Sequence, residues 1–167
     1  MEKITRYIIV FFILEVLQIF VFNNVSAIGQ IAPYLYVGFI LILPVTMSPT
    51  IVLLLAFLSG FMIDLSINTL GVHASATVMM AFARPTVLKL LAPRIGYESN
   101  NTPILKYFGL PWVLKYTSVC VTIHHIMLYF CFTLTFEDAG FMLIRMLINV
   151  FLTVLVIIIT EYFVIKR

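Results

Sequence analysis

Long apolar segments alternate with short polar turns along this chain. The turns contain Asn-Asn at 23–24, Met-Ser-Pro at 47–49, Ile-Asn-Thr-Leu-Gly at 67–71 and Glu-Asp-Ala-Gly at 137–140, which are residues typical of breaks between helices. A helix that crosses a bilayer needs about 20 mostly apolar residues. The pattern therefore predicts an all-α polytopic membrane protein with six transmembrane helices, over approximately residues 4–22, 34–46, 50–64, 71–91, 111–136 and 139–164.

Two of these segments have a second interpretation. Segments 34–46 and 50–64 are short for a full crossing, and the alternative is a re-entrant pair that enters and leaves the membrane on one side.

The first segment also resembles a secretory signal, with Lys3 and Arg6 before it and Val25-Ser26-Ala27 after it. Its length and the polar Glu15 favour a retained transmembrane helix.

Composition places the whole chain in the membrane. The 167 residues are 63% hydrophobic and only 10% charged, with a mean hydropathy of +1.15. A soluble domain carries about 25% charged residues, so this chain has too few charges to cover a globular surface in water. We expect a single transmembrane domain over residues 1–167 and no soluble catalytic domain. The basic residues are spread among the loops, which predicts no nucleic-acid partner.

Lysine and arginine residues predict the orientation, because cytoplasmic loops of membrane proteins are enriched in them. With the N-terminus in the cytoplasm, the acidic residues Asp64, Glu137 and Asp138 fall outside. The basic residues that then fall on the cytoplasmic side are Lys3, Arg6, Lys89, Arg94, Lys106, Lys115, Lys166 and Arg167. We therefore expect both termini in the cytoplasm, together with the loop over residues 92–110.

Two charged residues in the apolar segments lie at nearly the same predicted depth. Glu15 is seven residues before the outer end of the first segment, and Arg145 is six residues after the outer start of the last. Charges at membrane depth usually face the protein interior and have partners. One hypothesis is an ion pair between Glu15 and Arg145. The alternative is that Arg145 extends to the membrane surface and that Glu15 is protonated or hydrogen-bonded near Gln18.

Other polar residues in the apolar segments have structural interpretations. Arg84 precedes Pro85, which frees a backbone carbonyl that neighbouring groups must satisfy, and we expect Arg84 to lock the structure there. His124 and His125 are adjacent, whereas a two-histidine metal site on a helix uses a spacing of four residues. We therefore expect both histidines to pack or to form hydrogen bonds, and we expect no metal.

The densest group of polar residues lies between the third and fourth segments, over residues 60–74. In one interpretation Asp64 caps the hairpin by accepting hydrogen bonds from backbone amides, while Asn68 and Gly71 form the turn. In the other interpretation Asp64, Asn68, Gly71 and His73 form an exposed site at the outer surface for a partner. Both interpretations make this hairpin the candidate functional site.

The third segment also carries Ala56 and Gly60 four residues apart. Small residues at this spacing let two helices approach closely. We expect small side chains to pack the centre of the molecule. Large residues such as Phe12 and Phe151 are expected to face lipid or a partner.

The hairpin resembles the MreD family of rod shape-determining membrane proteins. The residues that carry the resemblance are Gly60-x-x-x-Asp64-Leu65 followed by Leu70-Gly71-x-His73-Ala74, with support from Gln18, Pro33 and Asn149. The length, the six-span plan and the short loops also match the family. The sequence departs from it in Ser66-Ile67-Asn68, where small residues such as glycine are usual, and in having histidine where some members have arginine.

This resemblance implies a non-enzymatic subunit of the bacterial cell-elongation (rod) complex, located in the cytoplasmic membrane and without a cofactor. Such a subunit regulates cell shape and lateral peptidoglycan synthesis by binding MreC, and it acts with the actin-like MreB and the peptidoglycan synthases. The family is similar in plan to the substrate-binding membrane subunits of energy-coupling-factor vitamin transporters. A membrane subunit that binds a small molecule is therefore the alternative. The outer loops show no cluster of aromatic residues and hydrogen-bond donors, which argues against that alternative.

Overall fold

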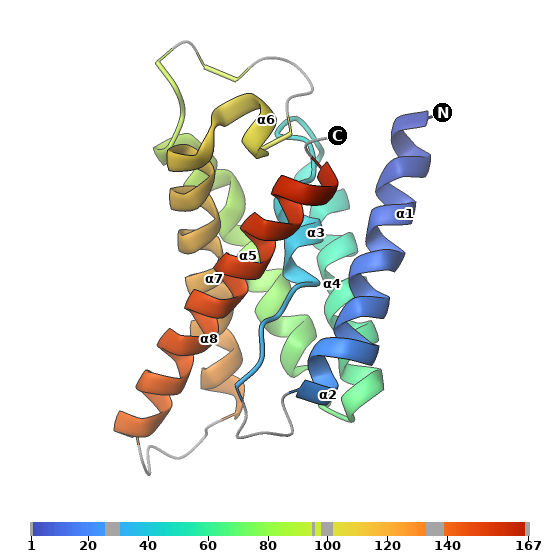
Figure 1. Cartoon of the computed structure of the whole chain (residues 1–167), viewed down its shortest axis with the longest axis vertical. Helices are drawn as coiled ribbons and strands as arrows, with labels where there is room; N and C mark the ends of the chain where they lie inside the picture. Colours follow the sequence, from blue (N-terminus) through green and yellow to red (C-terminus); the bar gives the residue numbers. More distant parts are fainter. Residues whose placement is uncertain (1, 26–30, 95, 98–101, 133–138, 166–167) are drawn as a thin grey trace.

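The computed structural model describes residues 2–25, 31–94, 96–97, 102–132 and 139–165. Within these residues the regular secondary structure is helical, as the sequence predicted. The elements are α1 (Glu2–Leu17), η1 (Gln18–Phe22), α2 (Asn23–Val25), α3 (Val37–Leu41), α4 (Pro49–Ile67), α5 (Val72–Leu90), α6 (Leu105–Phe108), α7 (Leu110–Phe132), α8 (Ala139–Thr160) and η2 (Glu161–Ile165), where η marks a π-helical turn. They form one helical bundle (Figure 1).

Three helices are long and apolar enough to cross a membrane: Ile4–Phe22, Pro49–Ile67 and Gly140–Phe163. They correspond to the first, third and sixth predicted segments. The third predicted segment, 50–64, is part of a longer helix of 19 residues, Pro49–Ile67. The chain is accordingly a helical membrane protein. Both termini lie at one end of the bundle, and the 64–73 hairpin lies at the other, which we call the terminal end and the hairpin end (Figure 1).

Helices α5 and α7 form the centre of the bundle. Helix α5 packs against α4 on one side and α7 on the other, and α7 packs against α8. The two central helices bury polar side chains such as His73, Arg84 and His124. They are less apolar than the three helices above because these polar groups contact protein instead of lipid.

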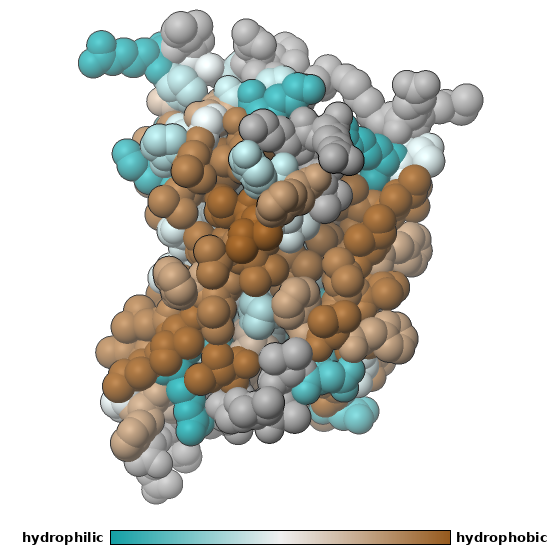
Figure 2. All heavy atoms as spheres, viewed as in Figure 1, coloured by the Kyte–Doolittle hydropathy of each residue, from teal (hydrophilic) through white to brown (hydrophobic). Residues whose placement is uncertain are grey.

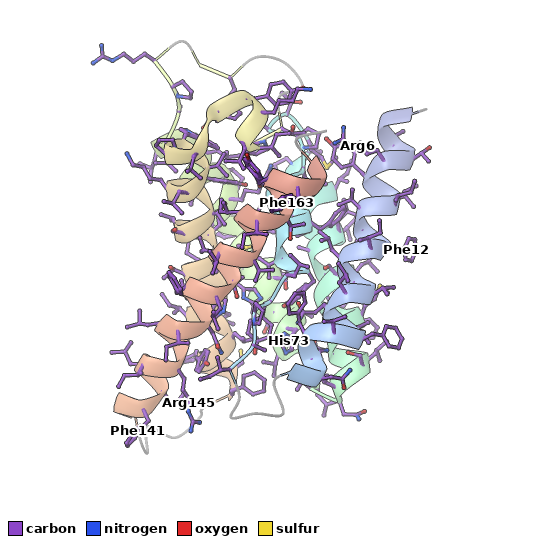
Figure 3. All side chains as sticks on the ribbon, viewed as in Figure 1. Arg6, Phe12, His73, Phe141, Arg145 and Phe163 are labelled. Atoms are coloured by element: carbon purple, nitrogen blue, oxygen red, sulfur yellow. The ribbon has the colours of Figure 1, made fainter. Side chains whose placement is uncertain are left out.

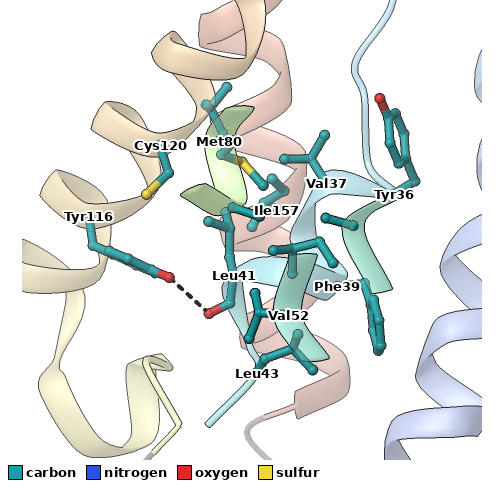
Figure 4. Packing of buried hydrophobic residues seen from close by; sticks show 14 of the residues in the cluster. Tyr36, Val37, Phe39, Leu41, Leu43, Val52, Met80, Tyr116, Cys120 and Ile157 are labelled. Atoms are coloured by element: carbon teal, nitrogen blue, oxygen red, sulfur yellow. Dashed lines mark hydrogen bonds between the residues drawn. The ribbon is translucent and has the colours of Figure 1, made fainter. Parts of the chain in front are cut away.

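The predicted helix over residues 34–46 is wrong. Only the five residues of α3 are helical, and residues 31–34 have no regular structure. The segment passes between the long helices through the middle of the bundle (Figure 1). Non-helical backbone at membrane depth is tolerated only where protein or a water-filled cavity covers it. Here Tyr36, Val37 and Leu41 have 0% exposure, and α3 is a centre of the apolar core (Figure 4).

The face of the bundle shown in Figure 2 is apolar over its middle, and hydrophilic residues gather toward its two ends. Large apolar residues on the outer helices are exposed, including Phe12 of α1 and Phe151 of α8. This confirms the prediction for Phe12 and Phe151, whereas Phe11, for which the same was expected, packs against the core. The small residue Ala56 is buried in the core, as expected.

Some predictions concern residues outside the described part of the chain. They include the outer acidic residues Glu137 and Asp138, the C-terminal Lys166 and Arg167, and the last residues of the predicted fifth helix, 133–136. Residues 26–27 of the signal-like motif also lie outside it.

Candidate functional site

Asp64 joins the end of α4 to the start of α5. Its Oδ1 accepts hydrogen bonds from Thr69 Oγ1 at 2.7 Å and from His73 N at 3.0 Å, and its Oδ2 accepts one from Ala74 N at 2.9 Å. The two amides belong to the first turn of α5, where backbone donors have no partner within the helix. The carboxylate also lies at the positive end of the helix dipole. The predicted cap is therefore confirmed.

The turn between α4 and α5 depends on two residues with left-handed backbone angles. Asn68 ends α4 with a φ of 56°, and Gly71 precedes α5 with a φ of 83°. Asparagine and glycine adopt this conformation more readily than other residues. The predicted roles of Asn68 and Gly71 in the turn are confirmed.

The prediction that Asp64 and His73 form an exposed partner site is wrong. Asp64 is 4% exposed and His73 is 1% exposed, because the cap draws α4 and α5 together. Asn68 and Gly71, the other two residues of the predicted site, are exposed. Two leucine side chains of the hairpin are exposed as well: Leu65 is 66% exposed and Leu70 is 100% exposed. The carboxylate itself is thus not accessible at the surface of the hairpin.

Gly60 permits the close approach of the two helices. A Cβ atom at this position would lie 2.5 Å from both Ala74 Cα and His73 O. Both are backbone atoms of α5, so they cannot move independently of the helix. The expected close helix contact is confirmed at Gly60, one helical turn before Asp64.

Gln18 fastens the non-helical segment to the first helix. Its Oε1 accepts hydrogen bonds from Leu35 N at 2.6 Å and Tyr36 N at 3.4 Å, and its Nε2 donates to Pro33 O at 3.3 Å. Unpaired backbone groups are costly in a membrane. Gln18 therefore stabilises a stretch of backbone that no helix satisfies.

Helix α8 holds the same segment from the opposite side. Asn149 Oδ1 accepts a hydrogen bond from Ala32 N at 3.2 Å, and Thr153 Oγ1 accepts one from Tyr34 N at 2.9 Å. Side chains of η1 and α8 thus hold segment 31–36 between them. The clamp fixes the position of the tyrosine side chains that the segment carries.

Tyr36 connects this segment to the two central helices. Its hydroxyl lies 2.8 Å from His124 Nε2 on α7 and 3.2 Å from His73 Nδ1 on α5. Thr77 Oγ1 lies 3.3 Å from the same hydroxyl and donates to His73 O at 2.7 Å. His73 points into the bundle near its hairpin end (Figure 3). We call Tyr36, His73, His124 and Thr77, together with Tyr34 and His125, the histidine–tyrosine cluster.

All three histidines of the chain surround the ring of Tyr34. The centroid of the Tyr34 ring lies 5.4 Å from the ring centroid of His73, 6.0 Å from that of His124 and 5.3 Å from that of His125. His125 Nδ1 lies 2.8 Å from the carbonyl oxygen of Val121, so this nitrogen carries the proton. The prediction that His124 and His125 pack and form hydrogen bonds is confirmed.

Each histidine nevertheless retains a buried ring nitrogen without a partner among the described residues. These atoms are His73 Nε2, His124 Nδ1 and His125 Nε2. A buried polar atom without a hydrogen bond is uncommon, and it usually has a specific explanation. Within the described residues no group of three or more His, Cys, Asp or Glu side chains could hold a metal ion. The cluster is an incompletely paired polar site in the interior of the bundle.

Arg84 forms a second buried polar layer, nearer the terminal end. Its Nε donates to the Tyr116 hydroxyl at 2.8 Å, its Nη2 donates to Leu43 O, and the Tyr116 hydroxyl donates to Leu41 O at 3.2 Å (Figure 4). Leu41 is the last residue of the short helix α3, and Leu43 lies just after it. The guanidinium thus satisfies backbone acceptors at the end of the non-helical segment, which agrees with the predicted locking role. Helix α5 continues through Pro85.

The predicted ion pair between Glu15 and Arg145 does not form. Glu15 Oε1 accepts a hydrogen bond from Ser59 Oγ on α4, and its Oε2 has no hydrogen-bond partner among the described residues. Arg145 is exposed on α8, near the hairpin end (Figure 3). The sequence argument compared depth alone. Helix α8 is inclined, and its N-terminal end diverges from α1 (Figure 1).

Sequence reasoning missed Tyr34, Tyr36 and Ser59 as parts of these sites. Pro33 directly before the tyrosines was the available indication, because it interrupts an apolar segment that is already short for a crossing. Such interrupted segments are typical of binding sites within membrane proteins.

The fold and these sites define an all-helical membrane protein with an apolar exterior and polar groups buried in the bundle. No protein-family model, curated protein or solved structure matches this chain.

Proposed function

We propose that this chain is a non-catalytic subunit of the bacterial cell-elongation complex, of the kind that the MreD family represents. One observation carries the proposal. The residues behind the family resemblance form two adjacent structural units: the capped hairpin, with Gly60, Asp64 and His73, and the clamp of segment 31–36, with Gln18 and Asn149. This grouping of the resembling residues is what supports the proposal.

The proposed partner is MreC, and the proposed contact surface is the hairpin end with the adjoining helix faces. Leu70 is completely exposed at the tip of the hairpin, and Leu65 is exposed beside it. Helices that associate within a membrane rely on packing and interhelical hydrogen bonds. In this proposal Asp64 has an indirect role, because it holds the hairpin that presents the leucines. MreB and the peptidoglycan synthases are the further partners within the complex.

The proposed location is the bacterial cytoplasmic membrane, with six crossings and both termini in the cytoplasm. In this arrangement segment 31–48 is a crossing that is mostly non-helical, and the loop over residues 92–110 is cytoplasmic. A reporter fused within residues 92–110 should give a cytoplasmic signal. A signal from the opposite side would contradict the arrangement and the partner assignment with it.

Crosslinking in native membranes tests the partner. A photoreactive amino acid at Leu70 is expected to yield an adduct with MreC. The matched control carries the same amino acid at Leu128, which is 0% exposed on α7, and should yield no adduct with another protein. Absence of an MreC adduct from Leu70, Leu65 and the exposed Phe12 alike would contradict the proposal.

A small-molecule binding subunit is the second candidate, and the histidine–tyrosine cluster favours it. The cluster gathers two tyrosines and three histidines with unpartnered ring nitrogens in one part of the bundle. This candidate predicts that a vitamin-like ligand raises the melting temperature of the purified protein in detergent. It also predicts that Tyr34→Ala abolishes the rise.

A further inference from the structure

The hydroxyl of Tyr36 has one proton to share between two histidines. His124 Nε2 lies 2.8 Å away and His73 Nδ1 lies 3.2 Å away. A neutral imidazole has one nitrogen that donates and one that accepts. Tyr36 can therefore donate to one ring while it accepts a hydrogen bond from the other, and the three side chains form a continuous hydrogen-bonded chain.

This chain has two proton arrangements. In the first, His124 Nε2 donates to the Tyr36 oxygen, Tyr36 donates to His73 Nδ1, and His73 carries its proton on Nε2. In the second, His73 Nδ1 donates to the Tyr36 oxygen, Tyr36 donates to His124 Nε2, and His124 carries its proton on Nδ1. Both rings are thus protonated on Nε2 in the first arrangement, and both on Nδ1 in the second.

The two ends of the chain are the buried nitrogens that have no partner among the described residues, His73 Nε2 and His124 Nδ1. In either arrangement one of these ends carries a proton and the other carries a lone pair. The ends therefore always have opposite hydrogen-bonding character. A fixed donor or acceptor at either end would hold the chain in one arrangement. The ends of this chain have no such partner among the described residues, in contrast to the oxygens of the Asp64 cap.

We propose that His124, Tyr36 and His73 form a proton relay, in which the two histidine rings change their protonated nitrogen together. A water molecule supplies a proton to His124 Nδ1, and the Nε2 proton of His124 passes to the Tyr36 oxygen. The Tyr36 proton passes to His73 Nδ1, and His73 Nε2 releases its proton to water. One proton enters and one leaves, so both rings and the phenol are neutral before and after the step.

The charged and titratable groups around the relay restrict proton transfer to the half of the bundle that contains the hairpin end. The Asp64 carboxylate binds the backbone amide of His73 and provides a negative charge beside that end. Glu15 is buried against α4 by its bond to Ser59. Toward the terminal end, the fixed positive charge of Arg84 opposes the passage of a proton. His125 donates its Nδ1 proton to Val121 O and takes no part in the relay.

His73 lies at one end of the relay, and its backbone amide binds the Asp64 cap of the hairpin. Tyr34 contacts all three histidine rings and is itself only partly buried. The relay thus connects a position beside the hairpin, His73, with the middle of α7. This inference goes beyond the proposed function and stands whether or not the hairpin binds MreC.

The test is nitrogen NMR of the purified full chain in lipid bilayers, with ¹⁵N-labelled histidine. The chain has only three histidines, and His125→Asn assigns one of them by its disappearance. The relay predicts that His73 and His124 each populate both neutral tautomers and that their Nε2-protonated fractions are equal. In the unmodified chain His125 serves as the internal reference, because its bond to Val121 keeps it protonated on Nδ1.

Two variants sharpen this test. Tyr36→Phe retains the ring and removes the hydroxyl, so the protonated fractions of His73 and His124 should lose their equality. Tyr34→Phe removes a hydroxyl that lies outside the relay, and the equality should persist. If Tyr36→Phe fails to fold, the comparison of the two rings in the unmodified protein still decides the question.

Two results would overturn the relay. One is unequal protonated fractions in the unmodified protein. The other is a single tautomer for both rings, either all Nε2 or all Nδ1, because the chain would then hold only one of its two proton arrangements. That arrangement is static and transfers no proton.

Discussion

His73 belongs to two buried polar sites that differ in how completely their polar atoms are hydrogen-bonded. Its backbone amide binds Asp64, whose oxygens accept three hydrogen bonds from the start of α5 and the turn before it. Its ring binds Tyr36 in a cluster where three ring nitrogens have no partner among the described residues. The two sites lie next to each other at the hairpin end of α5, at similar burial, so burial alone does not distinguish them.

The difference teaches how to separate structural from functional polar groups in this protein. A buried group whose hydrogen bonds are complete contributes stability, and its loss leaves several partners unpaired. A buried group with an unused atom contributes less stability than its burial suggests, and the unused atom is available for a proton or a ligand. By this criterion the Asp64 cap is structural, and the histidine–tyrosine cluster is the candidate for function.

The largest effect is expected from Asp64→Ala. Two buried amides would lose an acceptor, each costing about 1–3 kcal/mol, and the partly buried Thr69 hydroxyl would lose one as well. The free energy of unfolding should therefore fall by at least about 3 kcal/mol. Denaturant unfolding in detergent, followed by circular dichroism, measures this. Asp64→Asn is the control, because its amide oxygen keeps the bonds to Thr69 and His73 and loses only the bond to Ala74. Equal losses for the two variants would refute the capping role.

Gly60→Ala should have the next largest effect. The added Cβ would lie 2.5 Å from backbone atoms of α5, and overpacking of this kind costs about 1–3 kcal/mol. Gly140→Ala on α8 is the matched control, because nothing lies within 4 Å of its Cβ position. The control should leave stability unchanged or raise it by up to about 1 kcal/mol. Thermal unfolding of both variants would show whether the close contact is real.

Tyr36→Phe should cost less than either substitution near the cap. Hydrogen bonds between helices in a membrane average about 0.6 kcal/mol, so the unfolding free energy should fall by about 1 kcal/mol. The same unfolding assay applies, with Tyr34→Phe as the control for removal of a neighbouring hydroxyl. A loss as large as that of Asp64→Ala would mean that the cluster is a structural site, and the comparison above would fail.

The smallest expected effect concerns the partner of Glu15, which is Ser59 in the structure and Arg145 in the ion-pair hypothesis from the sequence. A double-mutant cycle of Glu15→Ala and Ser59→Ala should give a coupling free energy of at least about 0.5 kcal/mol, as is usual for residues in contact. The parallel cycle of Glu15→Ala and Arg145→Ala should be additive within about 0.5 kcal/mol. Coupling in the second cycle and additivity in the first would restore the ion pair.

Local patterns in the sequence were enough for the hairpin. Asp64, Asn68 and Gly71 act within ten residues of one another, so the roles of cap and turn follow from their types and spacing. Exposure was predicted wrongly for Asp64 and His73, because exposure depends on how closely α4 and α5 approach. The close approach that Gly60 permits also buries the Asp64 carboxylate.

The histidine–tyrosine cluster could not be predicted in the same way. Tyr36 is 37 residues from His73 and 88 residues from His124, and no periodicity within one segment relates them. The same holds for Glu15, whose partner Ser59 lies on another helix at a matching depth. Depth along the membrane follows from counting residues. The direction in which a side chain points around the bundle does not.

The amino-acid sequence by itself determined the helical class, the membrane environment and the caps and turns at helix ends, because these depend on composition and on neighbours a few residues apart. The tertiary structure alone decided that segment 31–48 is a mostly non-helical core and that Gln18, Asn149 and Thr153 hold it. It also brought Tyr36 between two histidines. The physical reason is that unpaired backbone groups in a membrane must find partners, and partners from distant helices exist only once the bundle has assembled.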